Sequence, residues 1–161
     1  MFIRSCTDAD MPAIVEIIND AAQIYHGAIP DDCWHTPYMP HKDLTREIAA
    51  GVTFQGIEDS GKLAGVMGLQ KVKDVALIRH AYVSPDCQGK GIGGLLLADL
   101  IRKADAPLLV GTWAAAEWAI RFYERHGFKL TSSEEKDRLL QTYWNISPRQ
   151  RETSVVMALA N

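Results

Sequence analysis

A glycine-rich run between an apolar segment and a helical pattern constrains the fold of this chain more than any other sequence feature. Residues 83–94 read Val-Ser-Pro-Asp-Cys-Gln-Gly-Lys-Gly-Ile-Gly-Gly and follow the apolar residues 75–83. Ile92, Leu96 and Leu100 then recur at helical spacing. Glycine lets the backbone approach a ligand closely, and the free N–H groups of a first helical turn favour an anion such as a pyrophosphate. The sequence therefore predicts a strand, a phosphate-binding loop and a helix.

Two known kinds of phosphate-binding loop fit this run poorly. A P-loop needs Ser or Thr directly after Gly-Lys, whereas Gly91 follows Lys90. The dinucleotide-binding pattern G-x-G-x-x-G is matched by Gly89, Gly91 and Gly94, but it requires an acidic residue about 20 positions later, after the next strand. That strand ends Gly-Thr-Trp over residues 111–113, without a carboxylate. In the dinucleotide-binding fold this motif also lies at the start of a βαβ unit. Here two predicted helices and a predicted hairpin precede the glycine run.

The rest of the chain alternates short strands and helices. Apart from the strand at 75–83, we predict strands at 2–5, 53–58, 63–70, 107–112, from 128, and at 154–159. We predict helices from a cap at Thr7 or Asp8 to Ile24, from a cap at Asp43 to Ala49, and over 92–100, 115–126 and 134–144. Residues 25–42 contain three prolines and several aromatic residues, so a long loop is expected there. The pattern is typical of one α/β domain with a mixed sheet over residues 1–161.

Composition and charge argue against several classes of protein. The net charge is −3, which gives no electrostatic basis for binding nucleic acid. No apolar run reaches the roughly 18 residues of a membrane span, and the first ten residues lack the apolar centre of a signal peptide, so we expect a cytoplasmic protein. Cys6, Cys33 and Cys87 are widely spaced, which indicates neither a disulfide framework nor a metal site.

A third phosphate-loop pattern accounts for the glycine run. Gln88, Gly91 and Gly93 match Gln/Arg-x-x-Gly-x-Gly/Ala, and Val-Ser-Pro at 83–85 precedes them. A second motif, Asn-x-x-Ala-x-x-Phe-Tyr-x-x-x-Gly-Phe, is matched by Ala119, Phe122, Tyr123, Gly127 and Phe128. On these two motifs the chain resembles, over most of its length, the GNAT superfamily of acyl-CoA-dependent N-acetyltransferases. One departure is Ala116, which stands where the family has an Asn that contacts the cofactor.

The resemblance implies a GNAT-like fold and a binding site for acetyl-CoA. The fold has a central, mostly antiparallel sheet that is splayed at the cofactor strand and flanked by helices. The loop N–H groups would hold the pyrophosphate, and a strand N–H near Tyr82 or Val83 would polarise the thioester carbonyl. The residues that the resemblance assigns to the cofactor are Tyr82, Val83, Gln88, Gly89, Lys90, Gly91, Ile92, Gly93, Gly94, Phe122 and Tyr123.

The resemblance also implies two catalytic roles. Tyr123 corresponds to the family's proton donor to the departing CoA thiolate, although a half-buried helix aromatic would look the same in sequence. An acceptor ammonium, with a pKa of about 10.4, must lose a proton before it can attack. His80, on the cofactor strand, is our candidate base, and a structural histidine is the alternative. Other candidates, acting through water, are Glu117, His35, Asp31 and Asp32.

The acceptor site is expected at the proline-broken loop. This segment closes over the substrate in the family, so Tyr25, Trp34, His35 and Tyr38 are candidate acceptor contacts, or else pins that hold the loop to the core. The tail at 143–151 would form the opposite wall or a homodimer contact. Arg79, Arg149 or Arg151 would suit a carboxylate if the acceptor is an amino acid.

The function expected from these features is acetylation of a primary amine of a small molecule. A protein N-terminus or lysine is an alternative acceptor. A non-catalytic acyl-CoA-binding module is the competing class, because Ala116 would be a first sign of a drifted site.

Overall fold

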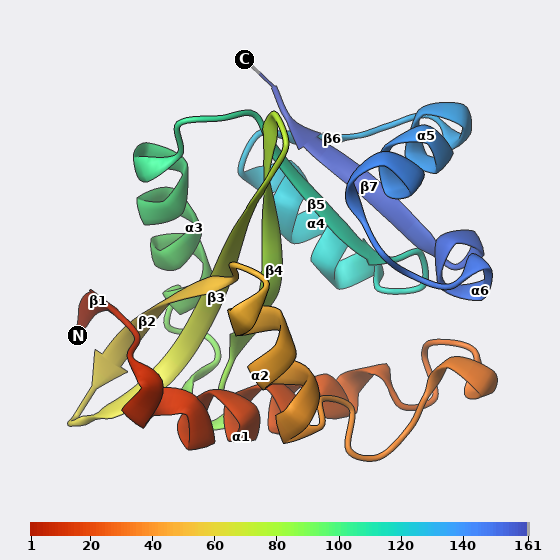
Figure 1. Cartoon of the computed structure of the whole chain (residues 1–161). Helices are drawn as coiled ribbons and strands as arrows, with labels where there is room; N and C mark the ends of the chain where they lie inside the picture. The colour runs from red at the N-terminus through yellow and green to blue at the C-terminus, as the bar shows by residue number, and fades with distance from the viewer. Residues whose placement is uncertain (161) are drawn as a thin grey trace.

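A seven-stranded sheet organises residues 1–160, the part of the chain that this computed structural model describes (Figure 1). The strand order is β1-β2-β3-β4-β5-β7-β6. The strands are β1 (Phe2–Ser5), β2 (Thr53–Asp59), β3 (Lys62–Val72), β4 (Val75–Val83), β5 (Leu108–Trp113), β6 (Phe128–Leu130) and β7 (Ser154–Leu159). The helices are α1 (Met11–Ala21), α2 (His41–Ala49), α3 (Ile92–Lys103), α4 (Glu117–Arg125), α5 (Ser133–Tyr143) and α6 (Pro148–Glu152).

Helices cover both faces of this sheet, and the strands divide their apolar side chains between the two faces. Ala76, Ile78, Leu108 and Val110 pack with α3 and with Tyr123 of α4. The alternate residues Val75, Leu77 and Leu109 pack with α5, whereas Phe54 and Val66 pack with α1 and α2. The predicted apolar face of α3 is confirmed, since Ile92, Leu96 and Leu100 are all buried. Within residues 1–160, no helix is long and apolar enough to cross a membrane.

The two central strands, β4 and β5, separate part of the way along their length. They form a parallel pair only at Ala76↔Leu108, Leu77↔Leu109 and Ile78↔Val110. Beyond these pairs β4 continues against β3, and β5 continues against β7. All other strand pairs in the described residues are antiparallel. The expectation of a mostly antiparallel sheet splayed at the cofactor strand is thus confirmed.

A β-bulge lies just beyond the last β4–β5 pair. Val66 is opposite Tyr82 and Gly68 is opposite Arg79, so a single β3 residue faces both His80 and Ala81. His80 has φ of 55°, a left-handed conformation that His adopts more readily than most residues. An extra residue increases the local twist of a strand and interrupts the alternation of its side chains. The bulge therefore helps to turn β4 away from β5.

Several element boundaries differ from the sequence prediction. Helix α2 starts at His41 after Pro40, two residues before the predicted cap Asp43, which instead lies in the first turn and pairs with Arg46. The first helix ends at Ala21, and Ile24 is exposed in a 3₁₀ turn. Helix α6 was not predicted, although the Ser147 hydroxyl accepts a hydrogen bond from the N–H of Gln150 and Pro148 stands at its start.

Gly68 permits the close approach of β3 to the bulge, because a Cβ there would lie 2.7 Å from the carbonyl oxygen of Arg79. We predict that Gly68→Ala lowers the free energy of unfolding by about 1–3 kcal/mol, as overpacking does. Urea denaturation of the variant and the wild type measures this difference in the free energy of unfolding. Gly93→Ala in α3 is the control: its Cβ would meet only ordinary contacts at 3.4 Å, and Ala in a helix is favoured by about 1 kcal/mol. Equal stability of Gly68→Ala and wild type would contradict this account.

Candidate active site

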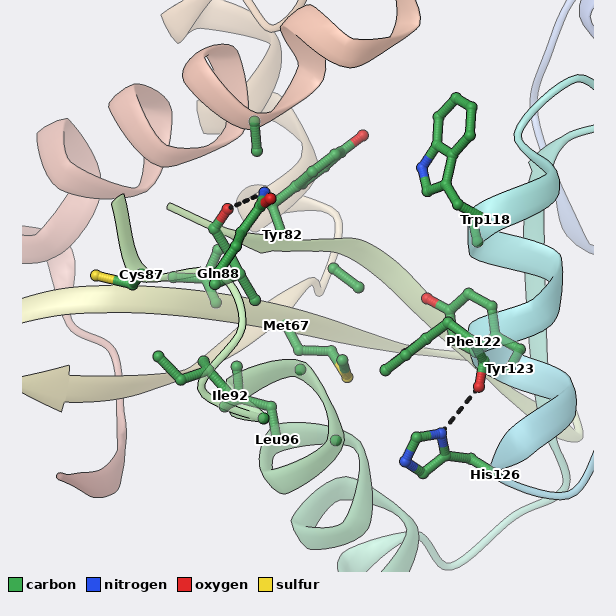
Figure 2. A pocket seen from close by; sticks show the side chains of 18 of the residues that line it. Met67, Tyr82, Cys87, Gln88, Ile92, Leu96, Trp118, Phe122, Tyr123 and His126 are labelled. Carbon is green, nitrogen blue, oxygen red and sulfur yellow. Dashed lines mark hydrogen bonds between the residues drawn. The ribbon is translucent and has the colours of Figure 1, made fainter. Parts of the chain in front are cut away.

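A cavity of about 630 Å³ lies between the glycine loop, helices α3 and α4, and the end of β4 that has no β5 partner. Figure 2 shows Ile92 and Leu96 of α3 on one side of it and Phe122 and Tyr123 of α4 on the other. All the predicted cofactor residues except one line this cavity: Tyr82, Val83, Gln88, Gly89, Gly91, Ile92, Gly93, Gly94, Phe122 and Tyr123. The exception is Lys90, whose ammonium lies 3.1 Å from the Asp59 carboxylate, outside the lining.

The glycine loop presents backbone donors to one end of this cavity. Gly89 and Gly91 have φ of 86° and 75°, which glycine adopts without strain. Gly91 caps α3, and the first helical N–H with a partner in this turn is that of Leu95, bonded to the Gly91 carbonyl. The N–H groups of residues 92–94 therefore have no partner within their helix and suit an anion. The Gln88 amide reaches back 3.5 Å to the Val83 carbonyl (Figure 2).

Tyr123 lies on the α4 side of the cavity and is 5% exposed. Its ring packs edge-on against Phe122 and Phe128, with centroid distances of 5.1 and 5.5 Å. Burial raises the pKa of the Tyr123 phenol above its ordinary value, because the phenolate would lose its hydration. The side chain therefore stays protonated at neutral pH.

A second cavity, of about 130 Å³, adjoins the first where β4 and β5 separate. Tyr25 and Tyr82 line both cavities. The other lining residues of the small cavity come from β4, β5, the proline-broken loop and the C-terminal part of the chain: Tyr38, Ile78, Arg79, His80, Gly111, Thr112, Trp113, Leu140, Trp144, Ile146, Gln150 and Ser154. Tyr25 and Tyr82 are thus walls that the two cavities share, and we call this place their junction.

Hydrogen-bonded aromatic residues surround the junction of the two cavities. The Tyr82 hydroxyl donates to Tyr25 at 3.4 Å, and the Trp113 indole N–H donates to the Tyr38 hydroxyl at 2.8 Å. Trp118 stacks on Tyr25 with centroids 6.0 Å apart. Burial raises the pKa of all three phenols, that of Tyr38 to about 12. This wall is therefore uncharged at neutral pH.

Two of the four predicted acceptor residues line the small cavity. Tyr25 and Tyr38 do so, whereas Trp34 and His35 do not. Trp34 is stacked between His26 and Tyr38, with centroids 4.9 and 5.8 Å away, and His35 is hydrogen-bonded to the Pro37 carbonyl. Trp34 therefore packs against Tyr38, which lines the small cavity, and does not line the cavity itself.

His80 lines the small cavity and is paired with a residue that sequence reasoning did not identify. Its Nε2 lies 2.6 Å from Oε1 of Glu47 in α2, and the same oxygen accepts a hydrogen bond of 2.8 Å from Arg79. Burial raises the pKa of Glu47, but the hydrogen bond with His80 and the charge of Arg79 outweigh it, so the pKa lies below its usual value. No sequence motif links residue 47 to residue 80. The other candidate bases Glu117, Asp31 and Asp32 line neither cavity.

The C-terminal tail forms a wall of the small cavity. The Trp144 ring packs over Gly111, where a Cβ would lie 3.3 Å from the ring. Arg149 makes a two-pronged ion pair with Asp32, at 2.9 and 3.1 Å, which ties the tail to the proline-broken loop. Of the arginines considered for a carboxylate, Arg79 lines the cavity, whereas Arg149 and Arg151 do not.

Ala116, which replaces the family's Asn, is fully buried. It packs in a cluster with Ala22, Tyr25 and Ile29, and its carbonyl accepts a hydrogen bond from Ala119 at the start of α4. Ala116 thus makes apolar contacts within the protein at the position where the family motif has a polar Asn.

Comparison with known protein families gives the same family as the two sequence motifs. A family model described as an acetyltransferase (GNAT) domain matches residues 15–142. No curated protein matches the chain.

Solved structures resemble the chain over nearly its whole length. Ribosomal-protein-S18-alanine N-acetyltransferase from Escherichia coli is 25% identical with a TM-score of 0.70, and the match covers 98% of this chain and 92% of that one. PaiA N-acetyltransferase from Thermoplasma acidophilum, solved with coenzyme A, is 17% identical with a TM-score of 0.74, covering 99% and 98%. Ribosomal-protein-alanine N-acetyltransferase from Brucella melitensis is 23% identical with a TM-score of 0.68, covering all of both chains. The last two likenesses concern the fold.

The glycine loop gives a direct test of coenzyme A binding. At a concentration 100 times Kd, a ligand stabilises the native state by about 2.7 kcal/mol. We predict that CoA raises the melting temperature of the wild type and leaves Gly91→Glu unchanged, because the new carboxylate would occupy the expected pyrophosphate site. Gly51→Glu is the control, since Gly51 also has a positive φ and open space around it but lies outside both cavities. A normal CoA shift in Gly91→Glu would place the cofactor elsewhere.

Proposed function

The chain belongs to the GNAT acetyltransferase family, and from this premise we propose that it transfers the acetyl group of acetyl-CoA directly to a primary amine of a small molecule. The observation that carries the proposal is the junction of two cavities where β4 and β5 separate. The large cavity, with the glycine loop at one end, suits a long phosphate-bearing donor. The small cavity suits the acceptor. Both substrates would then be bound together in a ternary complex.

The side chains at the junction suit a direct transfer. The free amine attacks the thioester carbonyl, a C–N bond forms and the C–S bond breaks. The nitrogen gives up one proton to His80, and the Tyr123 hydroxyl gives one to the departing sulfur. Both groups then re-equilibrate with solvent. A backbone N–H near Tyr82 or Val83 would polarise the carbonyl oxygen, in keeping with the absence of a β5 partner for β4 beyond Ile78.

The size and enclosure of the small cavity favour a small acceptor. Its volume is about 130 Å³, and the Asp32–Arg149 ion pair joins the loop and the tail that form its walls. Its lining contains Arg79 and His80 but no Asp or Glu. A second ammonium group on the acceptor would therefore lack a carboxylate partner, so a monoamine or an amino acid fits better than a polyamine.

A protein N-terminus is the second candidate acceptor. Two of the similar structures are named ribosomal-protein-alanine N-acetyltransferases, one of them at 25% identity. A non-catalytic acyl-CoA-binding module is the third candidate, favoured by the buried Ala116 in the second motif.

The three candidate functions can be distinguished by measuring the free CoA thiol released from acetyl-CoA in the presence of different acceptors. The acceptors to be tested are monoamines, amino acids, diamines and peptides that begin with alanine. We predict the highest kcat/KM among monoamines and amino acids. Activity on peptides alone would indicate a protein acetyltransferase. Tight CoA binding without thiol release from any amine would indicate a binding module and contradict the proposal.

Tyr123→Phe tests the proton donor. Phe keeps the packing of the ring against Phe122 and Phe128, and no hydrogen bond of the Tyr123 hydroxyl is found within residues 1–160, so stability and CoA binding should be retained. We predict a fall in kcat of about 100-fold, typical of the loss of a general acid. Tyr143→Phe is the control, because Tyr143 bonds to Asp74 outside both cavities. Unchanged turnover in Tyr123→Phe would assign that residue to packing.

A further inference from the structure

A hydrogen-bonded cluster lies at the bulge of β4, beside the small cavity. Glu47 Oε1 is its centre, 2.6 Å from His80 Nε2 and 2.8 Å from the Arg79 guanidinium. Arg79 also donates to the side-chain oxygen of Gln70 at 2.8 Å. The side chains of His80, Arg79 and Glu47 are 15%, 23% and 25% exposed, so the cluster is largely shielded from solvent.

The bulge explains why two consecutive residues reach the same carboxylate. In a regular strand, Arg79 and His80 would point to opposite faces. Here the extra residue at the bulge leaves both side chains on the face of α1 and α2, while Ala81 packs in the core under α3. Tyr82 returns to the α1 side. His80 has a left-handed φ of 55°, and such backbone strain is concentrated at functional sites.

Helix α2 positions Glu47 beside the β4 bulge. Leu44 is fully buried against α1 and the sheet, and Glu47 lies three residues later on the same side of the helix. Phe54 stacks near the His80 ring, with centroids 6.3 Å apart and planes inclined by 24°. The imidazole is thus held on one side by a carboxylate and along its face by an aromatic ring.

The contact with Glu47 fixes which ring nitrogen can accept a proton. An ionised carboxylate only accepts hydrogen bonds, so Nε2 carries the proton of the neutral ring and Nδ1 keeps its lone pair. Within residues 1–160, no protein hydrogen bond reaches Nδ1. The charged groups around the ring are Glu47 and Arg79, and exposed Arg46, the residue before Glu47 in α2, also acts on that carboxylate.

We propose that Glu47 is a positioning residue that holds His80 in the Nε2-protonated form, so that Nδ1 accepts the proton of the attacking amine. This inference rests on the proposed function. As the C–N bond forms, one N–H proton passes from the nitrogen to Nδ1, and the Glu47 carboxylate stabilises the imidazolium that results. Arg79 keeps that carboxylate ionised and correctly placed. The proton leaves to solvent after the product departs.

A double-variant cycle tests this role. His80→Asn removes the base while suiting the left-handed backbone, and Glu47→Gln removes the charge at nearly constant shape. We expect kcat to fall about 100-fold in His80→Asn and at least about tenfold in Glu47→Gln, with the KM for acetyl-CoA unchanged in both. The double variant should be no slower than His80→Asn, because Glu47 acts only through His80. Asp43→Asn, on the same helix and paired with exposed Arg46, should retain wild-type kcat.

Wild-type kcat in Glu47→Gln, or effects that multiply in the double variant, would overturn the positioning role while acetyl transfer by the wild type still supports the proposed function. The ¹⁵N NMR spectrum of the wild-type His80 ring gives a second test that needs no acceptor. At a pH high enough to leave a single proton on the ring, we expect that proton on Nε2. A ring protonated at Nδ1 would overturn the inference even if no substrate had been found.

Discussion

The separation of β4 from β5 is the constraint on which the rest of the site depends. The two strands pair at three positions, and the bulge at His80 and Ala81 then turns β4 away while β7 continues to hold β5. The large cavity lies against the free end of β4, and the small cavity lies between the diverging strands. Without this separation the sheet would be continuous, and no path would join a donor on the α3 and α4 side to an acceptor on the other side.

Charge at the junction is confined to one place. The phenols of Tyr25, Tyr82 and Tyr123 are buried and neutral, since burial raises their pKa values. The ionised groups are gathered at the Glu47 cluster, on the acceptor side of β4. Proton donation to sulfur and proton removal from nitrogen would thus occur on opposite sides of the strand, in environments that differ in polarity. This division suits a direct transfer, in which the two proton movements belong to different atoms.

The sequence predicted most of the residues that line the large cavity and few of those that line the small one. Strand β4, the glycine loop and α3 are contiguous, so periodicity and glycine spacing located them, and the second motif located Phe122 and Tyr123. Lys90 does not line the large cavity, because its side chain is paired with Asp59. The acceptor side is assembled from α2, the proline-broken loop, β5 and the tail. Glu47 could not be found, because its contact with His80 depends on helix packing and on a bulge that has no sequence signature.

A crystal structure with bound acetyl-CoA would test the central claim most directly. The account predicts the pyrophosphate at the N–H groups of the loop 88–93, the pantetheine arm beside the end of β4, and the acetyl carbonyl at the junction lined by Tyr25 and Tyr82. The acetyl group would then be open to the small cavity. Acetyl-CoA bound with its acetyl group away from this junction, or with β4 and β5 paired along their full length, would contradict it.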